Sequence, residues 1–271
     1  MKTAMHFATL GITGLLLAAS LTACKPREEG DEQLAEDAAA LSWETSRSSG
    51  LGRAVLSPLG AGDTEDADQA ASVYETRPVA GFYPAGCVSS TRSGVAVHLQ
   101  FDDCTGPFGL VRLNGGIDAT FSLKEGKLHA ELVDSGDLTV QDNPVDYAAS
   151  TDIRIDEGGY ALTWTASWSG ETAGGEAFNH SSDLDITSDP ETGCATLSGG
   201  SSGSVGERGM DSVIEGYAVC PLECPSAGKI TSTGKSSGRT VVVEFDGSAT
   251  AQVTLPSGDV YEAPLVCGAA E

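Results

Sequence analysis

After Pro78 the sequence alternates between apolar and polar residues with a period of two, and this pattern continues almost to the C-terminus. A period of two places successive side chains on opposite faces of a strand, so each strand has one buried face and one solvated face. The connections between these segments are short, which permits antiparallel neighbours but not parallel ones. The clearest alternating segments are 95–101, 117–123, 128–132, 147–155 and 160–168. We therefore predict that residues 78–271 form an all-β domain, a large antiparallel meander folded into a sandwich or a strongly curved sheet.

The residues before this domain have a different composition. Residues 24–77 are rich in Ala, Glu, Asp, Ser and Gly and lack the strand pattern. Apolar residues at helical spacing predict a short helix over 31–43, and 63–74 allows another. Residues 47–62 are expected to be a linker, so 24–77 is interpreted as a short, partly helical, acidic tether. Within the β domain, a sub-boundary is expected near 190–225.

Residues 1–23 have the properties of a secretory signal peptide. Lys2 precedes an apolar run of about 15 residues, which is too short to span a bilayer core of roughly 30 Å. A basic start, an apolar run and a small-residue cleavage site are typical of a signal that is removed. The run ends in Leu21-Thr22-Ala23-Cys24, which resembles the end of a bacterial lipoprotein signal.

This resemblance implies cleavage between Ala23 and Cys24 and lipidation of Cys24. Several acyl chains, such as palmitate, would then anchor the protein stably in a membrane. Lys25 follows the cysteine where an aspartate would, in enteric bacteria, favour retention in the inner membrane. The analogy favours the outer membrane. The alternative is an ordinary signal peptide in which Cys24 has no special role.

The cysteines predict disulfide bonds. The chain has seven cysteines, and setting Cys24 aside leaves an even number in an oxidising compartment. A sequential pairing is favoured because its pairs bracket hairpins or neighbouring strands, which brings the strand ends close together. The alternatives are other pairings or free buried thiols. The favoured pairs are Cys87–Cys104, Cys194–Cys220 and Cys224–Cys267.

The chain is strongly acidic, with a formal net charge of −24, or −25 once Lys2 is removed with the signal peptide. Such a chain repels nucleic acids and anionic lipid headgroups, so nucleic acid is excluded as a partner. A carboxylate cluster at Asp183, Asp185 and Asp189 is a weak calcium candidate, but its spacing does not match that of an EF-hand loop. We interpret it as solvated charge. No metal site and no cofactor are predicted.

Tyr160, Trp164 and Trp168 form an aromatic stripe on one face of a predicted strand. Leu162 lies between them on the same face, which favours a position in the core. The other interpretation is an exposed platform for sugar rings or a protein partner.

No catalytic group is identified in the sequence. Residues 199–203 match G-x-S-x-G, but a nucleophile elbow requires a following helix, and a strand pattern follows here. The histidines of the mature chain could serve a metal or a triad only if they converge with a carboxylate. We expect surface positions for all three of them: His98, His129 and His180.

Together with the lipid signal, three segments resemble a broad group of uncharacterised β-rich bacterial lipoproteins. They are the hairpin end at 99–106, the strand at 117–123 that follows two glycines, and the strand at 164–168. The resemblance covers most of the mature chain and implies an envelope-anchored β domain without implying an activity. We expect a lipid-anchored cell-envelope protein with a binding or structural role, in contact with the membrane through its anchor and with a glycan or another envelope protein. The alternatives are an envelope hydrolase, which needs a converged catalytic group, and a carrier of an apolar ligand in a β half-barrel.

Overall fold

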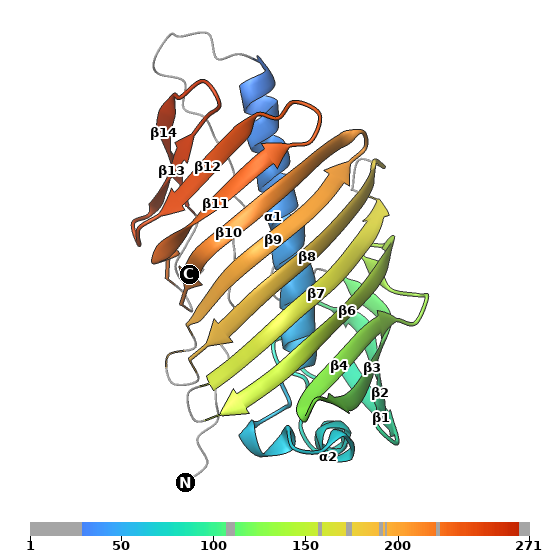
Figure 1. Ribbon diagram of the computed structural model, residues 1–271. Coiled ribbons are helices and arrows are strands. Elements are labelled where there is room, and N and C mark those ends of the chain that lie inside the picture. Colours follow the sequence, from blue (N-terminus) through green and yellow to red (C-terminus); the bar gives the residue numbers. More distant parts are fainter. Residues whose placement is uncertain are drawn as a thin grey trace.

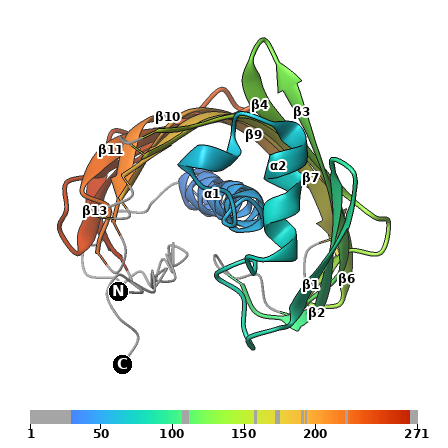
Figure 2. The ribbon, with the colours of Figure 1, turned by 90° about the horizontal axis from the view of Figure 1, so that it is seen from below.

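The computed structural model describes residues 29–106, 112–156, 159–171, 175–189, 192, 194–220 and 223–265. Within these residues, fourteen strands form one antiparallel sheet that curves around a long helix (Figures 1 and 2). The all-β prediction is confirmed, and of the two expected shapes the protein forms the strongly curved sheet.

Neighbouring strands in the sheet follow the order of the chain, except that the short β5 pairs with β3 and β6. The strands are β1 (Val88–Ser93), β2 (Ala96–Cys104), β3 (Leu113–Lys124), β4 (Lys127–Asp134), β5 (Thr139–Val140), β6 (Asn143–Asp156), β7 (Gly159–Glu171), β8 (Ala177–Ser188), β9 (Ala195–Val205), β10 (Arg208–Val219), β11 (Ala227–Gly234), β12 (Thr240–Phe245), β13 (Thr250–Thr254) and β14 (Val260–Pro264). Hydrogen-bonded pairing continues from β8 through β11, so the described strands show no break at the expected sub-boundary.

The period-two pattern separates a buried concave face from a solvated convex face. In β8, buried and exposed residues alternate along almost the whole strand. The hairpin between β3 and β4 turns at Glu125 and Gly126, which both have positive φ, as a tight turn of this kind requires. Apolar side chains on the concave face form most of the main core.

The helix α1 (Glu29–Val55) lies in the concave face and crosses the strands obliquely (Figures 1 and 2). The residues it turns toward the sheet follow a spacing of alternately three and four, which keeps one face of a helix inward. All of them are buried: Leu34, Ala38, Leu41, Thr45, Ser48, Gly52 and Val55. The expectation of a short helix followed by a linker from residue 47 is therefore wrong, because the helix continues to Val55 and its second half is part of the core.

Glycines set how closely α1 approaches the sheet. A Cβ atom on Gly52 of the helix would overlap the ring of Trp164 on β7. A Cβ atom on Gly203 of β9 would likewise overlap the Leu41 side chain. At these two points the absence of a side chain lets the helix and the sheet touch directly.

Shorter helices close one end of the groove. They are η1 (Ala61–Asp63), α2 (Ala67–Ser72) and η2 (Val73–Glu75), near the predicted second helix. The Asp66 carboxylate accepts hydrogen bonds from the backbone N–H groups of Asp68 and Gln69, which caps the start of α2. The buried Tyr74 hydroxyl donates to the carbonyl of Val55, 2.8 Å away, and so joins this end to the last turn of α1.

Disulfide bonds connect Cys87 with Cys104 and Cys194 with Cys220, the first two of the predicted pairs. Cys224 is disulfide-bonded as well. Its expected partner, Cys267, lies outside the described residues, so the third pair stays a prediction.

Candidate functional site

The contact between α1 and strands β6 to β9 contains a layer of polar side chains. The hydroxyl of Thr45 on the helix lies 2.8 Å from Nε2 of His180 on β8. The hydroxyl of Tyr147 on β6 donates to the backbone carbonyl of Ser48, 3.4 Å away. Ser182 and Ser201 lie at neighbouring buried positions of β8 and β9, where their strands pair. We call these residues the polar layer of the groove.

The hydrogen bonds of Thr45 determine the tautomer of His180. The Thr45 hydroxyl donates its single proton to the carbonyl of Leu41 at 3.0 Å, so it can only accept from the imidazole. His180 therefore carries its proton on Nε2, and Nδ1 remains a bare acceptor without a partner among the described residues. Burial lowers the pKa of His180 to about 4, so the ring is neutral near neutral pH.

Seven groups of this region have no hydrogen-bond partner within the described protein. They are Ser48 Oγ, Ser182 Oγ, His180 Nδ1, Glu44 Oε2, Arg47 Nε and the indole Nε1 atoms of Trp164 and Trp168. The side chains are deeply buried, with exposures of 0% for Ser48, 4% for Ser182 and 3% for His180. A buried polar group without a partner costs roughly 1–3 kcal/mol, and most native proteins have few of them. Their concentration at one interface means that α1 leaves much of the polar layer without hydrogen bonds.

An ion pair within α1 borders this layer. The guanidinium of Arg47 lies 3.0 Å from the Glu44 carboxylate and 5.9 Å from the centre of the Trp168 ring. Burial raises the pKa of Glu44, and the charge of Arg47 together with the hydrogen bond from Arg47 opposes this. The Trp168 ring in turn meets Tyr147 edge-on, with ring centres 5.5 Å apart.

The polar layer lies between apolar rows of the same sheet. The strand pairing places His180 opposite Trp168 and Gly203, and Ser182 opposite Ala166 and Ser201. Two rows further along the strands, the concave face is aliphatic. The buried residues of that row are Leu128, Ile153, Leu162, Ile186 and Leu197. The groove is therefore amphipathic along its length.

Trp164 and Trp168 belong to the core, with exposures of 0% and 1%. The exposed aromatic platform is therefore not formed, and the core interpretation is the one that fits their burial. Tyr160 is partly buried, and its hydroxyl donates to the carbonyl of Leu59 at 2.6 Å. All three side chains face the concave side, toward α1 and the segment that follows it.

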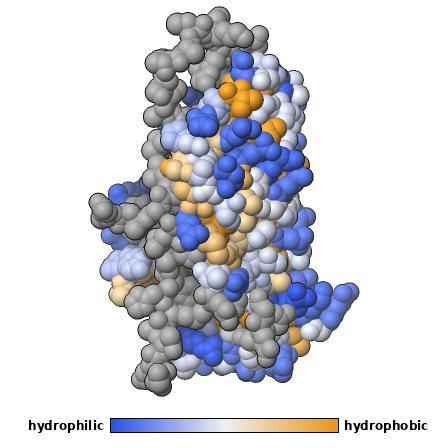
Figure 3. Space-filling model, turned by 90° about the vertical axis from the view of Figure 1, so that its left-hand side faces the viewer, coloured by the Kyte–Doolittle hydropathy of each residue, from blue (hydrophilic) through white to orange (hydrophobic). Residues whose placement is uncertain are grey.

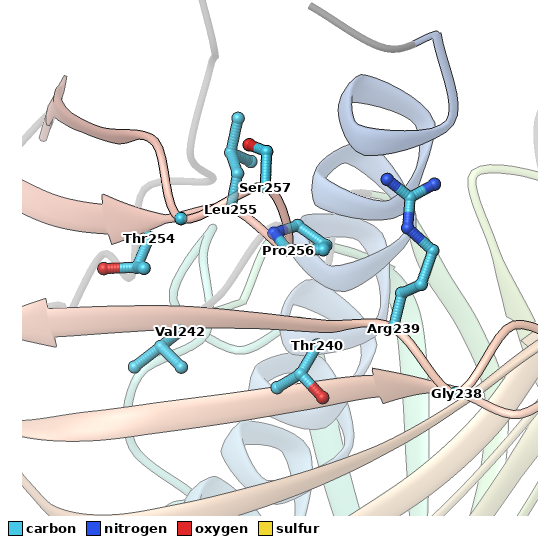
Figure 4. Close-up of a pocket in the computed structure, with 9 residues that line it drawn as sticks. Gly238, Arg239, Thr240, Val242, Thr254, Leu255, Pro256 and Ser257 are labelled. Atoms are coloured by element: carbon cyan, nitrogen blue, oxygen red, sulfur yellow. The ribbon is translucent and has the colours of Figure 1, made fainter.

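A pocket of about 510 Å³ lies between the start of β12 and the turn that joins β13 to β14 (Figure 4). Arg239 lines it and points toward the N-terminal turns of α1, where it forms an ion pair with the buried Asp31. The nearby Thr240 and Val242 side chains point away from the helix. Arg239 is the only charged residue that lines this pocket, and its charge is paired with Asp31 of α1. A second pocket, of about 400 Å³, has Arg154, Thr187 and Thr196 of strands β6, β8 and β9 in its wall.

The side of the molecule that carries β13 and β14 has a mostly hydrophilic described surface, with apolar side chains interspersed (Figure 3). On the convex face, Asp183 and Asp185 are exposed on alternate positions of β8. Among the described residues, no group of three or more His, Cys, Asp or Glu side chains is arranged to hold a metal ion. The structure does not bring Asp183, Asp185 and Asp189 together as a calcium site.

The expectation of surface histidines is wrong for two of the three. His180 is buried under α1, and only 8% of the His129 side chain is exposed, compared with 41% for His98. The alternation of apolar and polar residues could have predicted the burial of His180. Extending the strand predicted at 184–187 back to Ala177 places His180 on the buried face. His98 and His129 each bond a carboxylate on the next strand: Nδ1 of His98 lies 2.8 Å from Asp118, and Nδ1 of His129 lies 2.7 Å from Asp152.

The predicted signal peptide, its cleavage site at Ala23 and Cys24, and the lipidation of Cys24 fall outside the described residues. None of the helices in the described part of the chain has both the length and the apolar character needed to cross a membrane.

Comparison with known proteins gave no match: no family model fits the chain, and no curated protein or solved structure is significantly similar to it.

Proposed function

We propose that this chain is a lipid-anchored cell-envelope protein that binds a neutral amphipathic ligand in the concave face of its sheet, and that the ligand displaces the middle of α1. The lipoprotein-like signal ending in Cys24 supports the anchor and an outer-membrane location. The polar layer supports the binding site, and the observation that carries the proposal is its set of buried groups that α1 leaves unpaired.

The sequence of α1 supports its displacement. Its second half contains the run Ser48-Ser49-Gly50 and then Gly52. Each glycine inside a helix costs about 1 kcal/mol relative to alanine, and serine is also a weak helix former. The unpaired polar groups add a further cost of roughly 1–3 kcal/mol each to the docked position. Releasing this part of the helix is therefore easier than releasing a helix from a fully apolar groove.

The walls of the groove indicate the class of ligand. The aliphatic row around Leu162 suits an acyl chain, and the polar layer offers both donors and acceptors to a headgroup. The buried concave positions of β6 to β9 carry no Asp, Glu, Lys or Arg. A hydroxyl-bearing neutral headgroup such as a glycerol or a sugar fits this wall, because a charged headgroup would stay uncompensated there.

The test compares the mature protein with a variant in which the unpaired hydroxyls are removed, Ser48→Ala with Ser182→Ala. Cys24→Ser in every sample keeps the protein soluble without detergent. Titration with a fluorescent monoacylglycerol should show saturable binding to the starting protein. The double variant should unfold at higher urea concentration and bind the probe more weakly, because α1 now docks with two fewer unpaired groups. Ser181→Ala, on the exposed face of β8, is the matched control and should change neither quantity.

Two results would contradict the proposal. One is the absence of saturable binding, and the other is a double variant that binds as tightly as the starting protein while being more stable. The anchor is tested separately in cells with an alkyne-labelled palmitate, whose incorporation should be lost in Cys24→Ser.

A further inference from the structure

A second group of reactive side chains lies on the convex side of the sheet, away from the groove. It consists of His98 on β2, Asp118 on β3 and Ser135 in the loop between β4 and β5. His98 and Asp118 are directly paired positions of adjacent strands and face the same side. The histidine and the serine are accessible to solvent.

Asp118 orients the imidazole of His98. The Asp118 carboxylate lies 2.8 Å from Nδ1, so Nδ1–H donates to it and Nε2 keeps the lone pair when the ring is neutral. Nε2 lies 3.4 Å from Oε1 of Gln100, a long contact. The hydrogen bond to Asp118 is the largest cause of a raised pKa of His98. This is the arrangement in which a histidine acts as a general base for a nearby hydroxyl.

The loop that carries Ser135 is fixed in place by hydrogen bonds. The backbone N–H of Ser135 donates to the carbonyl of Gly116 at 3.0 Å, and that of Gly136 donates to the Asp134 carboxylate at 2.8 Å. Oδ1 of Asp137 accepts from the Gly116 N–H at 2.9 Å and from the Ser135 hydroxyl at 3.1 Å. Ser135 is therefore held over Gly116.

Gly116 shows that Ser135 and His98 converge. A Cβ atom on Gly116 would overlap Ser135 Oγ and would lie 2.6 Å from Cε1 and 3.3 Å from Nε2 of His98. The hydroxyl and the imidazole thus border the same methyl-sized space, which any residue other than glycine would fill. A serine–histidine hydrogen bond requires the Ser135 hydroxyl to turn from Asp137 toward His98. In proteins without substrate, such catalytic hydrogen bonds are often long.

We propose that Ser135, His98 and Asp118 form a hydrolytic centre for small neutral or cationic carboxylic esters. Ser135 Oγ attacks the ester carbonyl carbon while His98 Nε2 takes its proton. The carbon–oxygen bond to the alcohol breaks, and the alcohol leaves with the proton from His98. Water then attacks the acyl-serine with His98 again as the base, which releases the acid and restores the hydroxyl. Asp118 stays ionised and holds Nδ1–H throughout. Asp134 and Asp137 beside the serine disfavour anionic esters.

The experiment uses the full mature chain, a fluorophosphonate probe that labels activated serines, and p-nitrophenyl acetate. We expect one covalent label, mapped to Ser135, and slow acetate release that rises with pH as His98 loses its proton. Ser135→Ala should abolish both the label and the hydrolysis. His98→Gln should lower the hydrolysis by at least about a hundredfold, the usual contribution of a general base.

Ser122→Ala is the matched control. Ser122 pairs with His129, whose Nδ1 also bonds a carboxylate, but Nε2 of His129 is occupied by the Lys124 ammonium at 2.7 Å. This variant should keep full labelling and activity. Tryptophan fluorescence reports that each variant is folded. Absence of a label on the folded protein, a label at another serine, or full activity of Ser135→Ala would each overturn the proposal. The Ser48→Ala and Ser182→Ala substitutions should leave the labelling unchanged, which separates this centre from the groove.

Discussion

The buried histidine under α1 predicts a specific loss of stability in mild acid. His180 has a pKa of about 4 in the folded protein because burial disfavours its charged form, against about 6.5 when it is exposed in the unfolded chain. At pH values between these two, the unfolded chain binds more protons, so stability falls as the pH falls. The loss begins near pH 6.5 and is complete near pH 4. At about 1.4 kcal/mol for each pH unit between the two pKa values, protonation of His180 costs the folded state roughly 3 kcal/mol.

The assay is urea unfolding under non-reducing conditions at pH 7.5, 5.5 and 4.0, followed by the fluorescence of the buried tryptophans. Other groups titrate over the same range, so the informative quantity is the difference between the starting protein and His180→Gln. At pH 7.5 the variant should be less stable, because it loses the fit and the hydrogen bond to Thr45. By pH 4.0 the difference should have moved by roughly 3 kcal/mol in favour of the variant, which has no charge to bury.

His98→Gln provides a control of opposite sign. The pKa of His98 is raised, mainly by its hydrogen bond to Asp118. Its contribution to stability is therefore present below the unfolded pKa and disappears as the pH rises through the folded value. The deficit of this variant should be largest in acid and vanish at higher pH. A difference between the starting protein and His180→Gln that stays constant from pH 7.5 to 4.0 would refute the burial of a neutral imidazole under α1.

Two further predictions concern the contacts that hold α1 against the sheet. In urea unfolding, Gly52→Val should destabilise the protein by roughly 3 kcal/mol, because the valine side chain would overlap the Trp164 ring. Gly62→Ala is the control and should change stability by less than about 1 kcal/mol, because no atom lies near a Cβ at position 62. Equal effects of the two would contradict the direct contact between helix and indole. Arg239→Met should cost about 3 kcal/mol because it leaves Asp31 buried without its cation, and Asp31→Asn should cost only about 1 kcal/mol because Arg239 is partly exposed. The reverse order, measured by the same unfolding assay, would show that the ion pair does not hold the first turns of α1.

The position of α1 explains why glycines and polar residues of the groove lie opposite particular side chains of the helix. Where the helix presents Leu34 and Leu41, the sheet presents glycines at 234 and 203. Where the helix presents Thr45 and Ser48, the sheet presents the imidazole of His180 and the hydroxyl of Tyr147. Both surfaces change from apolar to polar at the same level, which is the property expected of a site shared by a helix and an amphipathic ligand.

The sequence by itself predicted most of the strands and their buried faces, and it favoured two of the disulfide pairs. Alternation with a period of two is a local property, because a strand turns each successive side chain to the opposite face. Cys87 and Cys104 could be paired because a hairpin brings residues near in sequence together. The burial of Trp164 and Trp168 followed from the same alternation, since Leu162 shares their face.

Only the tertiary structure decided what fills the concave face. Three successive inward positions in the second half of α1, Thr45, Ser48 and Gly52, carry no hydrophobic signal, so the apolar helix pattern is interrupted after residue 43. These residues are buried because a distant sheet curves around them, and burial of this kind cannot be read from neighbours in the sequence. The convergence of His98 with Ser135 has the same origin. Strand pairing and a close approach over Gly116 join residues that are far apart in the chain, and the pairing of strands is set by the whole sheet.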